Sequence, residues 1–133
     1  DRVIFVTHDR DEALRLAEDV VVLREGRVVA KGEAATIFAQ PPDAETAAYF
    51  GYTVMRCGDR TTAIAPGGLR LGEGDVCFDV LVERVLSVSG VVEGVGSHAG
   101  AQILFRIDPS QLTPAPGDVA VVSSEARSVV RFS

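Results

Sequence analysis

The chain begins with a short apolar run that leads into a helical pattern. Residues 3–6 read Val-Ile-Phe-Val, and a continuous run of this kind predicts a strand buried on both faces of a parallel sheet. Asp9, followed three residues later by Glu12, predicts a capped helix start, because the carboxylate can accept from the first free amide groups. Apolar residues Leu14, Leu16 and Ala17 supply one helix face. Together these elements make half of a βα unit.

The following residues predict a hairpin and two short helices. Gly26 can take the positive φ of a tight turn between two apolar runs. Pro41 ends one helical stretch, Asp43 can cap the next, and Gly51 can terminate it. The predicted elements are strands over 20–24 and 27–30 and helices over 34–40 and 44–50.

From residue 52 onward the pattern changes to short apolar runs separated by Gly, Asp, Pro and Ser. The clearest run alternates with a period of two, so that Ile103, Phe105 and Ile107 share one face. Closely spaced strands without helices between them predict a small barrel or sandwich. The expected strands cover 52–57, 60–65, 76–82, 89–95, 101–107, 119–123 and 128–132. The fold class expected is therefore an α/β unit over 1–51 followed by an all-β, OB-like small barrel or sandwich over 52–133.

Net charge and hydropathy argue against two kinds of partner, nucleic acids and the interior of a lipid bilayer. The formal net charge is −6, which argues against a nucleic-acid surface, because phosphate binding needs clustered Lys and Arg. The apolar runs are interrupted well before the roughly 18 residues that span a bilayer. We therefore expect no nucleic-acid partner and no direct membrane insertion.

Cys57 and Cys77 are the two cysteines of the chain. Their spacing fits neither a zinc knuckle nor a C-x-x-C redox pair. We expect free thiols in a reducing cytosol, and no metal site.

The most specific chemical signal lies where the first predicted strand ends. Thr7, His8 and Asp9, followed by Glu12 and Ala13, closely resemble the switch-histidine region of the ATPases of ATP-binding-cassette (ABC) transporters. In that family the histidine reaches the γ-phosphate of ATP. The resemblance implies that His8 contacts this phosphate, with Thr7 and Asp9 holding it in place. An imidazole suits the task because it can donate to a phosphate oxygen.

Other parts of an ATPase are missing from this sequence. It has no G-x-x-x-x-G-K-S/T loop to hold phosphates, and no strand ending in an acidic pair to hold magnesium. In the resembled family those parts precede the switch histidine. The resemblance thus implies the C-terminal end of an ATP-binding subunit whose intact form uses ATP and Mg²⁺. We expect the 133-residue chain alone to bind neither and to be inactive.

The β-rich part resembles the TOBE domain, an OB-like module that follows the ATPase domain in many importers. The resemblance lies in residues 65–71, 91–108 and 116–122. It implies a nucleotide-binding-domain remnant over 1–51 and a regulatory or dimerisation domain over 52–133. It also implies transmembrane permease subunits as partners, a homodimer, and a cytoplasmic location at the inner face of the membrane.

Two other functions remain open from the sequence. The β domain could be a binding module for a small oxyanion such as molybdate or tungstate, which would require backbone amide nests and a nearby cation. It could also be a structural adaptor that dimerises through strand edges. The glycine-rich stretch 94–100 is followed by a strand and not a helix, which predicts a hairpin loop with His98 at its tip in place of a dinucleotide site.

Overall fold

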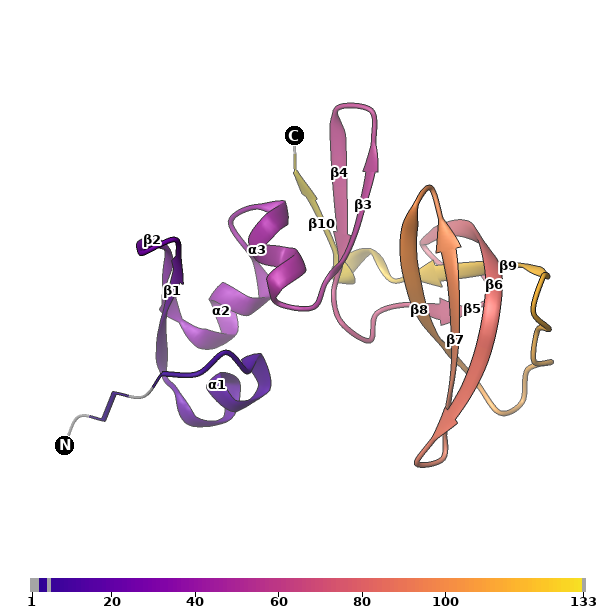
Figure 1. The fold of residues 1–133 in the computed structure, drawn as a ribbon, viewed down its shortest axis with the longest axis horizontal. Coiled ribbons are helices and arrows are strands. Elements are labelled where there is room, and N and C mark those ends of the chain that lie inside the picture. The colour runs from indigo at the N-terminus through magenta and orange to yellow at the C-terminus, as the bar shows by residue number, and fades with distance from the viewer. Residues whose placement is uncertain (1–2, 5, 133) are drawn as a thin grey trace.

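The computed structural model of the chain describes residues 3–4 and 6–132. Three short helices and a two-stranded sheet form one end of the molecule, and a β-barrel forms the other (Figure 1). The elements follow one another as α1 (Arg10–Leu16), β1 (Asp19–Arg24), β2 (Arg27–Glu33), α2 (Ala34–Ala39), α3 (Ala44–Tyr49), β3 (Thr53–Cys57), β4 (Arg60–Ile64), β5 (Arg70–Leu71), β6 (Val76–Val88), β7 (Val91–His98), β8 (Ala101–Ile107), β9 (Val119–Ser124), a single 3₁₀ turn (Ala126–Ser128) and β10 (Val129–Phe132).

The described residues of the strand predicted over 3–6 do not form a strand. Val3, Ile4 and Val6 carry no strand pairing and are 84%, 93% and 97% exposed, and Phe5 lies outside the described residues. A buried strand needs neighbours on both sides to pair its backbone groups and cover its side chains. Among the described residues, β1 and β2 pair only with each other in an antiparallel sheet. The parallel sheet expected for residues 1–51 is therefore not present in the described part of the chain.

The hairpin and all three helices form within a few residues of their predicted bounds. Glu25 and Gly26 have φ values of 53° and 76° in the turn between β1 and β2, as a tight hairpin requires. A carboxylate oxygen of Asp9 accepts from the amides of Asp11 and Glu12 at 2.9 and 3.2 Å, so α1 begins at the predicted cap.

A first core joins the helices to a three-stranded sheet of order β10-β4-β3. The rings of Phe38 and Phe50 meet edge to face at 4.7 Å, a favourable aromatic geometry. The buried members of this core are Ala13, Ala34, Phe38, Ala47, Phe50, Tyr52 and Ala63. The last strand, β10, returns to this sheet, so the C-terminal end of the chain packs close to the helices (Figure 1).

The second core fills a closed barrel of order β5-β8-β7-β6-β9. The alternation predicted for β8 is confirmed: Ile103, Phe105 and Ile107 are buried and the residues between them are exposed. The other buried members are Ile64, Leu69, Val80, Val82, Ala120 and Val122. The all-β, OB-like expectation is consistent with this closed barrel, in which strand pairing satisfies the backbone groups.

Most of the glycine-rich stretch 94–100 is strand. The hairpin loop predicted there is much shorter than expected. Residues up to His98 belong to β7, and only Ala99 and Gly100 turn into β8. A Cβ atom on Gly94 would lie 2.2 Å from the Phe105 ring, and one on Gly96 would lie 2.4 Å from the Leu81 carbonyl oxygen. These glycines make room for close packing in the barrel and not for a loop.

Candidate functional site

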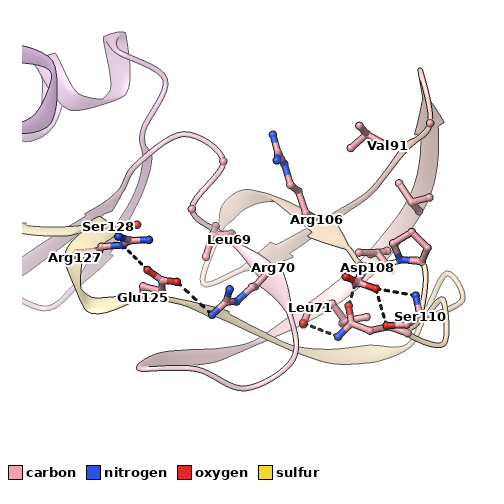
Figure 2. Close-up of a pocket in the computed structure, with 17 residues that line it drawn as sticks. Leu69, Arg70, Leu71, Val91, Arg106, Asp108, Ser110, Glu125, Arg127 and Ser128 are labelled. Carbon is pink, nitrogen blue, oxygen red and sulfur yellow. Dashed lines mark hydrogen bonds and ion pairs between the residues drawn. The ribbon is translucent and has the colours of Figure 1, made fainter. Parts of the chain in front are cut away.

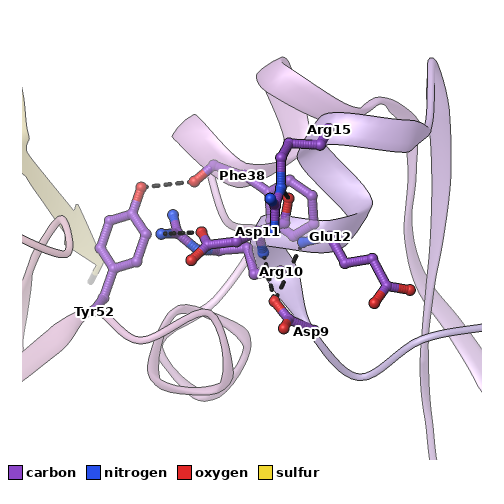
Figure 3. A network of polar contacts seen from close by, with 7 residues as sticks. All are labelled: Asp9, Arg10, Asp11, Glu12, Arg15, Phe38 and Tyr52. Atoms are coloured by element: carbon purple, nitrogen blue, oxygen red, sulfur yellow. Dashed lines mark hydrogen bonds and ion pairs between the residues drawn. The ribbon is translucent and has the colours of Figure 1, made fainter.

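The predicted switch-histidine segment lies immediately before helix α1, and Figure 3 shows its last residue, Asp9, at the start of that helix. His8 is exposed. The hydroxyl oxygen of Thr7 accepts from the Asp9 amide at 3.0 Å, and the Asp9 carboxylate caps the helix. The Thr7 hydroxyl thus bridges across His8, and the Asp9 carboxylate holds the start of the helix that follows; both side chains bond to backbone amides and not to the imidazole.

Helix α1 is held in place from its buried side. Ala13 packs in the core that contains Phe38 and Tyr52. The Tyr52 hydroxyl donates to the Phe38 carbonyl oxygen at 2.7 Å (Figure 3), and burial raises the pKa of this hydroxyl. Arg10, in the first turn of α1, forms an ion pair with Asp11 at 3.2 Å. The backbone at His8 is therefore attached to a capped helix with a packed face.

An ion pair joins the hairpin to helix α3. Arg24 contacts both carboxylate oxygens of Asp43 at 3.2 Å, and Asp43 also accepts from the Thr46 amide at 2.7 Å. The Arg24 hydrogen bond and then the Thr46 amide lower the pKa of Asp43 to about 2. This carboxylate acts as a helix cap and a structural anchor, since its hydrogen-bonding capacity is used within the fold.

A groove of about 780 Å³ opens on the barrel beside β5 and the end of β8 (Figure 2). Its charged lining comprises Arg70, Arg106, Arg127, Asp108 and Glu125. Figure 2 shows Arg70 and Arg127 directed toward Glu125, while Arg106 points away from them. The Arg70–Glu125 separation is 3.8 Å, and Arg127 forms a closer ion pair with the same carboxylate.

Other polar residues of the groove are held by local contacts. Asp108 accepts from the Ser110 hydroxyl and amide at 2.6 and 2.8 Å, and these hydrogen bonds lower the pKa of its carboxyl. Gln111 donates to the Leu71 carbonyl oxygen at 2.9 Å. Sequence reasoning missed this groove. One signal was available, because the alternation of β8 places Arg106 on its outward face. The sequence did not indicate that Arg70, on the distant two-residue strand β5, pairs with it.

His98 lies at the end of β7 and not at a loop tip. Its Nδ1 is 2.7 Å from the Asp79 carbonyl oxygen, and its ring centroid is 4.9 Å from that of Phe78. Because a carbonyl oxygen only accepts, Nδ1 carries the proton in this contact. This arrangement connects β7 to β6 and gives His98 a structural role.

Three further observations concern metals, thiols and membranes. The described residues include no group of three His, Cys, Asp or Glu side chains placed to hold a metal ion. Cys77 is an exposed free thiol whose sulfur lies 3.3 Å from the Gly74 amide nitrogen, and the Cys57 side chain lies outside the described residues. None of the helices in the described ranges is both long and apolar enough to cross a membrane.

Comparison with known proteins finds relatives whose sequences align with most of this chain. The sn-glycerol-3-phosphate import ATP-binding protein of Burkholderia mallei is 29% identical over 116 residues, which is 86% of this chain and 30% of the relative. The putative 2-aminoethylphosphonate import ATP-binding protein of Salmonella typhi is 31% identical over 86% of this chain and 28% of its own length. The Fe(3+) ions import ATP-binding protein of Pseudomonas fluorescens is 30% identical with the same coverage.

No protein-family model matches the chain. The chain spans less than a third of the length of these relatives, and the matched region is their C-terminal part. Because 86% of the chain is aligned, the match includes residues of both the helical end and the barrel. The chain is therefore a relative of the ATP-binding proteins of ABC importers and corresponds to the C-terminal part of those proteins.

Proposed function

We propose that this chain belongs to an ATP-binding subunit that energises solute uptake by ATP hydrolysis in the intact protein. The observation that carries the proposal is the match of 86% of the chain to import ATP-binding proteins at about 30% identity. In that reading, residues 1–51 are the end of the nucleotide-binding domain and the remnant of its α/β fold, and residues 52–133 are a TOBE-like domain that regulates or dimerises the subunit.

His8 is the residue that we assign to the nucleotide site, as a γ-phosphate contact. Its exposure and its place next to the capped start of α1 support this role. An imidazole N–H on a well-fixed backbone can donate to an oxygen of the transferring phosphoryl group. Thr7 and Asp9 support it through hydrogen bonds to the Asp9, Asp11 and Glu12 amides, which hold the backbone that follows His8.

ATP and Mg²⁺ would act in the whole protein. Bound there, Mg²⁺ would neutralise the charge that develops on the phosphates. We assign it no ligand in this chain, because the described residues form no cluster suited to a metal. The isolated chain is accordingly expected to bind no nucleotide and to be inactive.

The proposed partners follow from the same reading. They are the transmembrane permease subunits of an importer and a second copy of the ATP-binding subunit, with the protein peripheral to the cytoplasmic face of the membrane. Within residues 52–133 the closed barrel has a core of its own, as a domain does, while β3, β4 and β10 pack in the core that contains the helices.

The test is the replacement His8→Ala in a full-length protein that contains this chain. We expect steady-state ATP turnover to fall by about 10²-fold or more, with nucleotide binding largely retained, because the contact acts on the phosphoryl group in the transition state. His98→Ala is the matched control, since His98 contacts the Asp79 carbonyl oxygen within the barrel. Unchanged turnover in the His8 variant would contradict the proposal.

A further inference from the structure

A thiol and a buried hydroxyl lie side by side on two neighbouring strands of the barrel. Cys77 on β6 and Ser123 on β9 are direct partners in the antiparallel pairing of these strands. Such partners share one face of a sheet, with Cβ atoms about 5 Å apart. Cys77 is exposed, whereas Ser123 is 0% exposed. An accessible thiol therefore lies next to a hydroxyl that is fully covered.

The segment between β5 and β6 passes over this hydroxyl. A Cβ atom on Gly74 would lie 2.7 Å from the Ser123 hydroxyl oxygen, so only a residue without a side chain lets the backbone approach so closely. The next residue fixes the segment, because the Asp75 carboxylate accepts from the Ala126 amide at 3.0 Å. Gly74 is thus part of the cover over Ser123.

The Cys77 sulfur holds Gly74 in this place. The Gly74 amide donates to the sulfur at 3.3 Å, and the thiol donates to the Gly74 carbonyl oxygen at 3.1 Å. Sulfur is a weak donor and a weak acceptor, so both contacts are easily given up. A chemical change at the sulfur acts directly on the residue that covers Ser123.

The Ser123 hydroxyl lacks a partner. In the part of the chain that the structure describes, no hydrogen bond reaches this buried oxygen. Its other cross-strand partner, Arg70, is directed toward Glu125 (Figure 2). A buried hydroxyl without a hydrogen bond carries an unrecovered desolvation cost. An oxygen atom added to the neighbouring Cys77 sulfur would supply the missing partner.

We propose that Cys77 is a site of reversible oxidation by peroxide, and that the Ser123 hydroxyl binds the oxygen that oxidation adds. The sulfur attacks one oxygen of hydrogen peroxide, an S–O bond forms and the O–O bond breaks. The thiol proton leaves with the other oxygen as water, so the thiol is oxidised to a sulfenic acid and the peroxide is reduced. Two molecules of a small thiol reverse the step and release water and their disulfide.

Oxidation also changes the cover over Ser123. The S–H donor to the Gly74 carbonyl oxygen is lost, so the backbone at Gly74 shifts while the Asp75 anchor holds the next residue. The site is independent of the nucleotide role proposed for His8, because it is built entirely from the barrel and the segment that leads into β6.

The experiment follows the sulfenic acid in the 133-residue chain carrying Cys57→Ser, so that Cys77 is the single thiol. The chain is treated with hydrogen peroxide, the excess is removed with catalase, and dimedone is added after increasing delays to trap the sulfenic acid. Mass spectrometry should find the adduct at Cys77, and dithiothreitol given before dimedone should prevent it. In ¹⁵N NMR spectra, peroxide should shift the amides of residues 73–77 and 123–126, and dithiothreitol should restore them.

Two variants test the part played by the hydroxyl. Ser123→Ala should shorten the lifetime of the sulfenic acid about fivefold, the effect of losing one hydrogen bond of ordinary strength. Its free energy of unfolding in the thiol form should not fall, because the hydroxyl has no partner there. Ser87→Ala, at an exposed serine of the same strand β6, is the matched control and should leave the lifetime unchanged.

Several results would overturn the proposal. Absence of a dimedone adduct at Cys77 would exclude the oxidation site. Equal lifetimes with Ser123 and with Ser123→Ala would exclude the hydroxyl as the partner of the added oxygen, and so would a clear loss of stability in Ser123→Ala before oxidation. An equal shortening in Ser87→Ala would show a general effect of serine removal in place of a defined contact.

Discussion

The helical end and the barrel bury their apolar side chains in different ways. The barrel core consists mainly of β-branched and aromatic residues, and its strands pair in a closed cycle. The helical core contains four alanines and three aromatic residues, and its hairpin leaves Val21, Leu23 and Val28 between 58% and 63% exposed. Closure lets the barrel satisfy its own backbone groups, whereas the helical end depends on packing against β3, β4 and β10.

This difference predicts where the molecule opens first. Burial of apolar surface stabilises a region with small buried side chains and an exposed sheet face less than it stabilises a closed barrel with branched residues. We therefore expect hydrogen exchange to be faster at α1–α3 than at β6–β8.

The largest effect is expected from Gly94→Ala in the barrel. The added methyl group would lie 2.2 Å from the Phe105 ring, so the ring must leave its place in the core. We expect a loss of about 3 kcal/mol in the free energy of unfolding, at the upper end for overpacking, measured by urea denaturation. Gly100→Ala is the control, because its methyl group would meet open space although φ is 82°. Equal losses in both variants would show that Phe105 packing does not set the cost.

An intermediate effect is expected from Tyr52→Phe at the helical end. It removes the donor to the Phe38 carbonyl oxygen and leaves a buried acceptor unsatisfied, at a cost of about 1–2 kcal/mol. Hydrogen exchange should speed up at α1–α3 and change little in the barrel. Tyr49→Phe, at a residue 65% exposed, is the matched control. Equal acceleration in both regions would mean that the two cores open as one unit.

The smallest effect concerns pH and the anchor between Arg24 and Asp43. The pKa of Asp43 is lowered to about 2 from 3.8, so its stabilisation is complete above about pH 5 and is lost progressively as the pH falls through 3.8 and 2 toward about 1. Because the Asp43 side chain is 43% exposed, we expect only about 1 kcal/mol after solvent screening. Asp43→Asn should be less stable by that amount at pH 7, and the difference should shrink as the pH falls to 2 and vanish below it. Asp59→Asn, in the exposed turn after β3, is the control. If the difference in unfolding free energy between Asp43→Asn and the original chain stayed constant from pH 7 to 2, the lowered pKa of Asp43 would be contradicted.

Local signals predicted much of the fold. The cap at Asp9, the turn at Gly26 and the alternation in β8 all formed as expected. Each depends on residues close together in the sequence. A carboxylate caps the amides that follow it, a glycine permits a positive φ, and a period of two sends alternate side chains to opposite faces of a strand. The same locality placed Thr7, His8 and Asp9 together before a helix. Their role in a nucleotide site stays a prediction.

Other features depended on contacts between distant segments. A run such as residues 3–6 carries the composition of a buried strand, but composition does not supply the neighbouring strands that would bury it. Gly94 and Gly96 suggested a loop, yet Phe105 and Val80 occupy the space that their missing side chains leave. The pairing of Arg70 with Arg106 likewise arises only when the barrel closes.

Residue identities and short-range patterns were enough to predict the caps at Asp9 and Asp43, the turn at Gly26, the alternation in β8 and the resemblance to import ATP-binding proteins. The members of each core, the glycines that make room for packing and the charged residues that line the groove could not be predicted in this way. Side-chain burial and charge pairing depend on residues that are far apart in the chain. Their proximity is fixed only when the backbone pairs strands β5, β8 and β9 into a closed cycle.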